Sequence, residues 1–179
     1  MIKIIRIPLC IFLASLLLSG CGTLSREEVM KEAKSTDLSK EVIDGMRLGM
    51  TFNSINQFNH FVPHPDNKQY NSSRNFDQYW NKQIITSVDR KTRDILQVSV
   101  LDDNNHSSTA KGIKNEMPIK QVISTYGKNF YKYEDKNQSI YQIGYVDLQH
   151  NVDLVFTYSN GKVKTINLNY AFDRLKWTK

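Results

Sequence analysis

The feature that most constrains the fold is a pattern of alternating apolar and polar residues that occurs twice with the same spacing. Residues 84–88 match 152–156, and residues 98–100 match 166–168, with an offset of 68 positions in each case (152 − 84, 166 − 98). Alternation with period two is typical of a strand with one buried face, and a one-residue slip would exchange the faces. The pattern therefore predicts strands at all four places.

Turn residues separate the strands within each pair. Asp89 to Thr92 lie between the first two strands, and Ser159, Asn160 and Gly161 lie between the second two. Asn-Gly favours a tight hairpin because both residues accept positive φ at little cost. We expect a hairpin in each half, preceded by a further strand at 139–147 in the second half and around 75–80 in the first.

A helix start is expected ahead of each set of strands. Met46, Met50 and Ile55 match Ile113, Met117 and Val122 at an offset of 67 (113 − 46). Thr51 can cap the first helix, and Pro118 suits the first turn of the second. The expected fold class is therefore α+β, with two tandem units that each pack a short helical segment on a sheet of three or four antiparallel strands.

This layout resembles a known family. The segments RLGMTFNSINQF and NEMPIKQVISTYG, followed by strands that end in NGKVKTINL, are similar to the beta-lactamase inhibitory protein fold over residues 45–172. Small outer-membrane assembly lipoproteins share a similar unit. The first unit departs from the pattern, because His60 stands where the second has Gly127, and the inhibitor's disulfides have no counterpart. The resemblance implies the duplicated fold and leaves the inhibitor's target unsupported.

The N-terminus has the organisation of an export signal. Lys3 and Arg6 precede an apolar stretch at 7–18, which is too short for a permanent bilayer span. The sequence Leu-Ser-Gly-Cys at 18–21 resembles the bacterial lipobox, in which the cysteine receives diacylglycerol and further acyl chains such as palmitate. We expect residues 1–20 to be a cleaved signal peptide and Cys21 to be the lipidated first residue of the mature chain.

Export limits the chemistry of what remains. The second cysteine, Cys10, lies in the signal, so the mature chain has no free thiol for a disulfide, a zinc-thiolate site or a nucleophile. Its 159 residues (179 − 20) divide into a polar tether or short helix at 21–44, a first unit at 45–105 and a second at 106–179. The precursor's net charge of +6 becomes +4 without Lys3 and Arg6, which favours an anionic membrane or cell-wall partner over nucleic acid.

Candidate reactive residues are few. His60 and His64 are four positions apart with Asp66 nearby, but Pro63 and Pro65 favour an extended loop over a metal site. No nucleophile elbow, phosphate-binding glycine loop, zinc-protease motif or dinucleotide fingerprint is present. We expect no metal, no cofactor and no enzymatic activity.

Aromatic residues have the best claim to a binding role. Four of them near a loop or on an unassigned sheet face form the candidate binding face: Tyr131, Tyr133, Tyr141 and Tyr145. Exposed tyrosines give a large contact area at small entropic cost, although the same residues can instead pack between the units.

The expected function is a lipid-anchored module on the extracytoplasmic face of the membrane, in a Gram-positive envelope, that contacts a protein or cell-wall polymer. Two alternatives remain at this point. One is an accessory lipoprotein of a conjugation or secretion apparatus, and the other is an envelope hydrolase with a site assembled from distant residues such as His60, His64 and Asp66.

Overall fold

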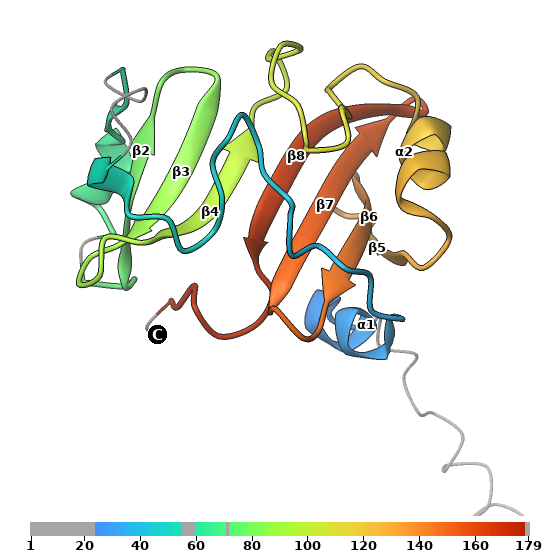
Figure 1. Cartoon of the computed structure of the whole chain (residues 1–179), viewed down its shortest axis with the longest axis horizontal. Coiled ribbons are helices and arrows are strands. Elements are labelled where there is room, and N and C mark those ends of the chain that lie inside the picture. Colours follow the sequence, from blue (N-terminus) through green and yellow to red (C-terminus); the bar gives the residue numbers. More distant parts are fainter. Residues whose placement is uncertain (1–23, 55–59, 71, 178–179) are drawn as a thin grey trace, which may run out of the picture.

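Hairpins between strands that are neighbours in the sequence build most of the fold. The computed structural model describes residues 24–54, 60–70 and 72–177. Within these residues, eight antiparallel strands form one sheet in the order β1-β2-β3-β4-β8-β7-β6-β5 (Figure 1). The strands are β1 (Val62–Pro63), β2 (Phe76–Trp80), β3 (Ile84–Asp89), β4 (Ile95–Val100), β5 (Tyr131–Asp135), β6 (Ile140–Asp147), β7 (Val152–Ser159) and β8 (Lys162–Tyr170). The strands expected from alternation are therefore present.

The continuous sheet corrects the expected fold class. The α+β layout of two tandem units, each with its own helix and its own three- or four-stranded sheet, is wrong. Strand β4 pairs with β8, so that Ser99 lies opposite Asn167, and these two residues are themselves 68 positions apart (167 − 99). In two separate sheets the last strand of each would leave a row of backbone groups without partners. Pairing the two strands satisfies both rows and removes two exposed edges.

Helices contribute little to this mostly β chain. Helix α1 (Arg26–Glu32) begins at a capping box, in which the side chains of Ser25 and Glu28 each bond the other residue's backbone N–H. Helix α2 (Ile119–Tyr126) follows Pro118 and ends at Gly127, whose φ of 93° suits a residue without a Cβ. Where the first unit was expected to have its helix, the structure has one 3₁₀ turn, η3 (Phe52–Ser54), and residues 55–59 lie outside the described residues. A second 3₁₀ turn, η5, spans Pro65–Asn67.

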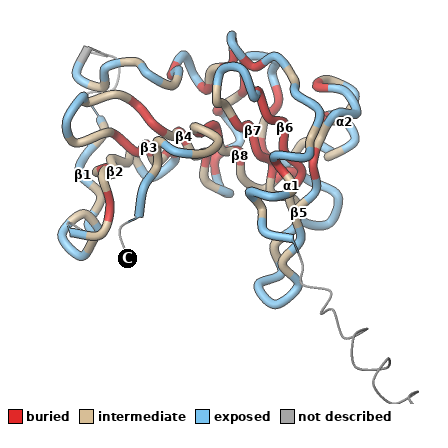
Figure 2. The backbone as a smooth tube through the Cα atoms, turned by 90° about the horizontal axis from the view of Figure 1, so that it is seen from below, coloured by how far each residue is buried: buried red, intermediate tan, exposed pale blue. Residues whose placement is uncertain are grey.

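The two faces of the sheet are covered by different segments. On one face, Ile43, Met46 and α2 residue Val122 pack on Val98, Leu154 and other inward-facing strand residues to form the main core. On the opposite face, α1 places Met30 against Tyr131 and Val155 in a second, smaller core. Figure 2 shows buried residues running along the central strands, as expected for a sheet covered on both faces.

Two hairpin turns set the ends of the central strands. Asn160 and Gly161 both have positive φ, 50° and 73°, so the Asn-Gly turn between β7 and β8 forms as predicted. The β3–β4 turn (89–94) is held by Asp89, whose Oδ1 accepts hydrogen bonds from the backbone N–H groups of Lys91 at 2.8 Å and Thr92 at 2.9 Å. This second turn borders the candidate site.

Candidate functional site

The C-terminal segment (171–177) leaves β8 and returns to the opposite half of the sheet. Asn75, just before β2, holds it at three points. The Asn75 backbone N–H donates to the Lys176 carbonyl at 3.2 Å. Its side chain accepts from the Lys176 N–H at 2.8 Å and donates to the Arg174 carbonyl at 3.0 Å. These bonds fix two cationic residues beside the β3–β4 turn.

A cleft of about 550 Å³ lies between this segment and the turn. Its lining carries four cationic and two acidic side chains, together with one amide. The lining residues are Asn75, Asp89, Arg90, Lys91, Asp173, Arg174 and Lys176. We call this the basic cleft. Burial alone would raise the pKa of the Asp89 carboxyl, but bonds from the backbone amides of Thr92 and Lys91 outweigh burial and lower it. Asp89 is therefore an ionised part of the turn and already has its own donors.

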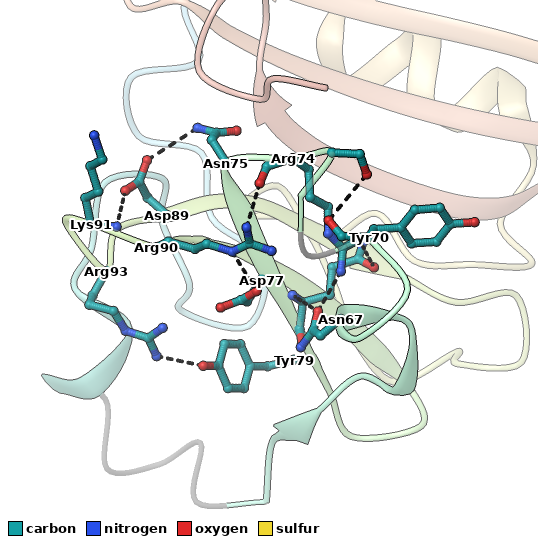
Figure 3. Close-up of polar contacts among 12 residues, drawn as sticks. Asn67, Tyr70, Arg74, Asn75, Asp77, Tyr79, Asp89, Arg90, Lys91 and Arg93 are labelled. Carbon is teal, nitrogen blue, oxygen red and sulfur yellow. Dashed lines mark hydrogen bonds and ion pairs between the residues drawn. The ribbon is translucent and has the colours of Figure 1, made fainter. Parts of the chain in front are cut away.

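The two arginines of the basic cleft are held in place. Arg90 Nε lies 2.9 Å from Asp77 Oδ1, and its Nη1 donates to the Arg74 carbonyl at 2.9 Å (Figure 3). Arg174 Nη2 lies 3.3 Å from Asp94 Oδ2. By contrast, Lys91 and Lys176 are exposed, and neither has an ion pair among the described residues. Figure 3 shows the Lys91 side chain extending away from its turn. The cleft thus has two fixed guanidinium groups and two free ammonium groups.

Arg74 packs against the end of the C-terminal segment. Its guanidinium lies against three aromatic rings, 4.9 Å from the centroid of Phe76, 5.4 Å from Tyr70 and 5.8 Å from Trp177. It is 4% exposed. Burial and the neighbouring positive charge of Arg90 lower its pKa. These contacts fix the end of the C-terminal segment, whose Trp177 remains 58% exposed.

A second polar cluster docks α1 on the sheet. The Asp153 carboxylate accepts from Arg26 Nη2 at 2.6 Å, from the Tyr131 hydroxyl at 2.8 Å and from the Asn169 amide at 3.1 Å. The Tyr131 ring lies on Gly144, where an added Cβ would be 2.2 Å from the ring. Burial raises the pKa of Asp153 despite these three partners. We assign this cluster to the docking of α1, because its members are occupied with one another.

The four candidate tyrosines do not share one face. Tyr131 lies opposite Gly144 across the β5–β6 pair, so Tyr131 and Tyr133 point to the α1 side. Tyr141 and Tyr145 alternate with Gly144 along β6 and point to the other side. Tyr131 and Tyr145 are buried at 4% and 0%, whereas Tyr141 is 38% exposed. Tyr131 and Tyr145 are therefore packing residues and do not form an exposed binding face. Burial also raises the pKa of Tyr145 to about 12.

The histidines are also placed separately. His60 lies in an exposed turn. His64 caps η5, with its Nδ1 accepting from the Asp66 N–H at 3.3 Å, and its ring lies 5.2 Å from that of Trp80. Among the described residues, the one group with metal-ligand spacing lies elsewhere: Asp37, Asp147 and His150. Asp147 Oδ2 there already accepts from the Leu38 N–H and lies 2.8 Å from His150 Nδ1, which explains the group as a structured turn.

Cys21 lies outside the described residues, so its lipidation stays a prediction. No protein-family model, curated protein or solved structure matches the chain, and the family resemblance therefore also stays a prediction. In the part of the chain that the structure describes, no helix has the length and apolarity needed to cross a bilayer.

Sequence reasoning missed the basic cleft. Its cations come from two short stretches, 89–94 (DRKTRD) and 173–177 (DRLKW), each of which begins with an aspartate and mixes acidic with basic residues. Neither stretch is a block of like charge, which is the usual sign of an electrostatic site. The one sequence signal for the cleft was that both stretches begin with Asp-Arg and have a lysine shortly after it.

Proposed function

We propose that this protein is a lipid-anchored extracytoplasmic binding module without enzymatic activity, which holds an anionic component of the cell envelope in its basic cleft. Residues 1–20 would direct export and be removed, and the lipid on Cys21 would hold the folded part at the membrane. The observation that carries the proposal is the pair of exposed lysines in the cleft, Lys91 and Lys176, neither of which forms an ion pair among the described residues, although Asp89 and Asp173 also line the cleft.

The arrangement favours binding over catalysis. Arg90 and Arg174 are fixed by Asp77 and Asp94, so their positive charges keep set positions in the cleft wall, and the exposed ammonium groups of Lys91 and Lys176 are the donors available to an oxyanion. The cleft offers no group placed as a nucleophile with an adjacent base, which a hydrolytic site needs. His64 is engaged in capping its own turn, so the alternative of a hydrolase built on His60, His64 and Asp66 gains no support from the geometry.

Two measurements test the proposal. The first is metabolic labelling with a radioactive fatty acid in a Gram-positive host. The native chain should carry label and fractionate with membranes, and Cys21→Ser should lose both properties. Equal labelling of the two chains would remove the anchor from the proposal.

The second measurement is binding of the purified protein to washed envelope fragments at low and at high salt. The double variant Lys91→Glu/Lys176→Glu should bind more weakly and lose most of the salt dependence. The matched control is Lys120→Glu/Lys128→Glu, which changes the net charge equally at two exposed lysines at the other end of the sheet. If both variants behave alike, the cleft is not the binding site.

A further inference from the structure

An exposed tryptophan ends the C-terminal segment that lines the basic cleft. Trp177 directly follows the cleft residue Lys176 in the chain and is 58% exposed. Its ring meets those of Tyr70 and Phe76 nearly edge-on, with centroids 5.5 and 5.6 Å away. These contacts hold the indole in one position while most of it faces solvent. A fixed, exposed indole that directly follows a free lysine in the chain combines two features of membrane-interface contacts.

The cleft lies on the same side of the molecule as the predicted anchor. Figure 1 shows α1, the C-terminal segment and the β3–β4 turn along one edge, with β4 and β8 running away from it. Arg26, the first residue of α1, is five positions after Cys21. A chain of this length reaches at most roughly 18 Å when fully extended. If Cys21 carries lipid, the α1 end of this edge must therefore lie near the bilayer.

Exposed apolar residues mark the α1 end of the same edge. Leu24 precedes α1 and is 51% exposed, and Leu148, in the turn after β6, is 45% exposed. The Leu148 N–H donates to Ser35 Oγ at 3.0 Å, which ties this turn to the residues after α1. Helix α1 also carries the acidic residues Glu27 and Glu28 in its first turn, so attraction to an anionic surface has to come from the cleft end.

We infer that the basic cleft and Trp177 dock on the membrane itself, with the phosphate groups of anionic phospholipids at Lys91 and Lys176 and with the indole in the interfacial layer. This inference rests on the proposed function for the anchor at Cys21 and names the anionic partner of the same cleft. The protein would then lie along the bilayer, with the lipid at its α1 end and the cleft at the other.

A phosphodiester polymer of the cell wall offers the same phosphate chemistry. The exposed Trp177 favours the bilayer, because a lipid interface gives an apolar indole a reason to stay exposed at the end of the cleft-lining segment and a wall polymer does not. The polymer and free phosphate are therefore treated as outcomes of the test.

The test uses the chain from Gly22 onward, which contains every residue of both hydrophobic cores and carries neither signal nor lipid. Vesicles of phosphatidylcholine alone are compared with vesicles that contain phosphatidylglycerol, in flotation assays. We expect binding only to the anionic vesicles. Lys91→Glu/Lys176→Glu should weaken it by about 30-fold or more, because each lysine near an anionic bilayer contributes about five-fold in affinity. Lys120→Glu/Lys128→Glu should have a much smaller effect.

A second readout reports on Trp177. Acyl-brominated phosphatidylglycerol should quench the fluorescence of the native protein on binding, and Trp177→Phe should abolish this quenching while Trp80 remains. Equal binding to both vesicle types, or no quenching, would overturn the inference. If the protein binds soluble poly(glycerol phosphate), or if inorganic phosphate stabilises it against unfolding, and it does not bind vesicles, the inference is overturned in favour of those ligands. Absence of fatty-acid label on the native chain, or equal labelling of the native chain and Cys21→Ser, is a separate result, which would overturn the proposed anchor and leave these vesicle measurements valid.

Discussion

Replacing Arg26 with Met tests whether the buried cluster under α1 holds the helix on the sheet. Met keeps most of the side-chain length and removes the charge that lies 2.6 Å from Asp153. Removing one partner of a fully buried ion pair costs about 3–5 kcal/mol. The Asp153 side chain is 0% exposed but that of Arg26 is 36% exposed, so water replaces part of what is lost. We therefore expect a loss of about 2–3 kcal/mol at neutral pH.

The pH dependence gives the sharper criterion. Burial already raises the pKa of Asp153 above its ordinary value, and the loss of Arg26 should raise it further. A carboxyl group with a raised folded-state pKa binds a proton on folding, so its contribution to stability falls as pH rises from the ordinary pKa to the folded one. Arg26→Met should therefore lie close to the native protein in acid, where Asp153 is protonated, and fall below it toward neutral pH.

Urea unfolding, followed by tryptophan fluorescence at several pH values, measures this difference. Arg26→Met/Asp153→Asn should regain part of the loss at neutral pH, because it buries no charge. Lys31→Met on the same helix is the control, since the Lys31 side chain is 60% exposed and pairs with Glu27, a contact that contributes less than about 0.5 kcal/mol. A difference between Arg26→Met and the native protein that is constant with pH, or a double variant no more stable than the single one, would refute this reasoning.

Four other substitutions probe separate parts of the fold. Gly144→Ala places a Cβ 2.2 Å from the Tyr131 ring and should lower the free energy of unfolding, measured by thermal unfolding, by about 2 kcal/mol or more. Gly112→Ala is the comparison: its site has open space and a φ of 78°, so the loss should be about 1 kcal/mol. Burial raises the pKa of Glu41, so native stability should fall as pH rises just above the ordinary value, and Glu41→Gln should remove that slope in urea titrations. Asn75→Ala removes two bonds to the C-terminal segment and should speed hydrogen exchange at the Lys176 amide while changing global stability by less than about 1 kcal/mol.

Local features of the fold were predictable because short-range physics decides them. Alternation located β3, β4, β7 and β8, since period two reports directly which face of a strand is buried. The Asn160-Gly161 turn formed because both residues tolerate positive φ. The capping box that begins α1 likewise depends only on Ser25 and Glu28, three positions apart.

The pairing of β4 with β8 was not predictable in the same way. Alternation says which face of each strand is buried and gives no information about which edge meets which. The β4–β8 pair joins residues such as Val98 and Leu168, which are far apart in the sequence, and backbone groups make the bonds. Nothing in the side-chain pattern distinguishes one shared sheet from two adjacent ones. The repeat was therefore interpreted as two separate units, and that expected fold class was wrong.

The tyrosines show the limit of composition as a guide to a binding face. Tyr131 is buried because Gly144, directly opposite on β6, leaves room for its ring, and because Asp153 accepts its hydroxyl. Each of these partners is a single residue at a distant position. That these residues contact Tyr131 can be inferred only when the strand register is known.

The basic cleft depends on the fold in a further way, because folding decides which charges remain free. The stretches 89–94 and 173–177 each mix acids with bases, so their composition predicts little net attraction. In the structure Asp77 pairs with Arg90, Asp94 pairs with Arg174, and Asp89 accepts bonds from its own turn. These three acids are thereby engaged in fixing the scaffold, and the fourth, Asp173, accepts a hydrogen bond from the Asn151 amide, while Lys91 and Lys176 stay available to an external anion. A chain with a modest and evenly spread positive charge can thus present a localised cationic site without any cluster of lysines in its sequence.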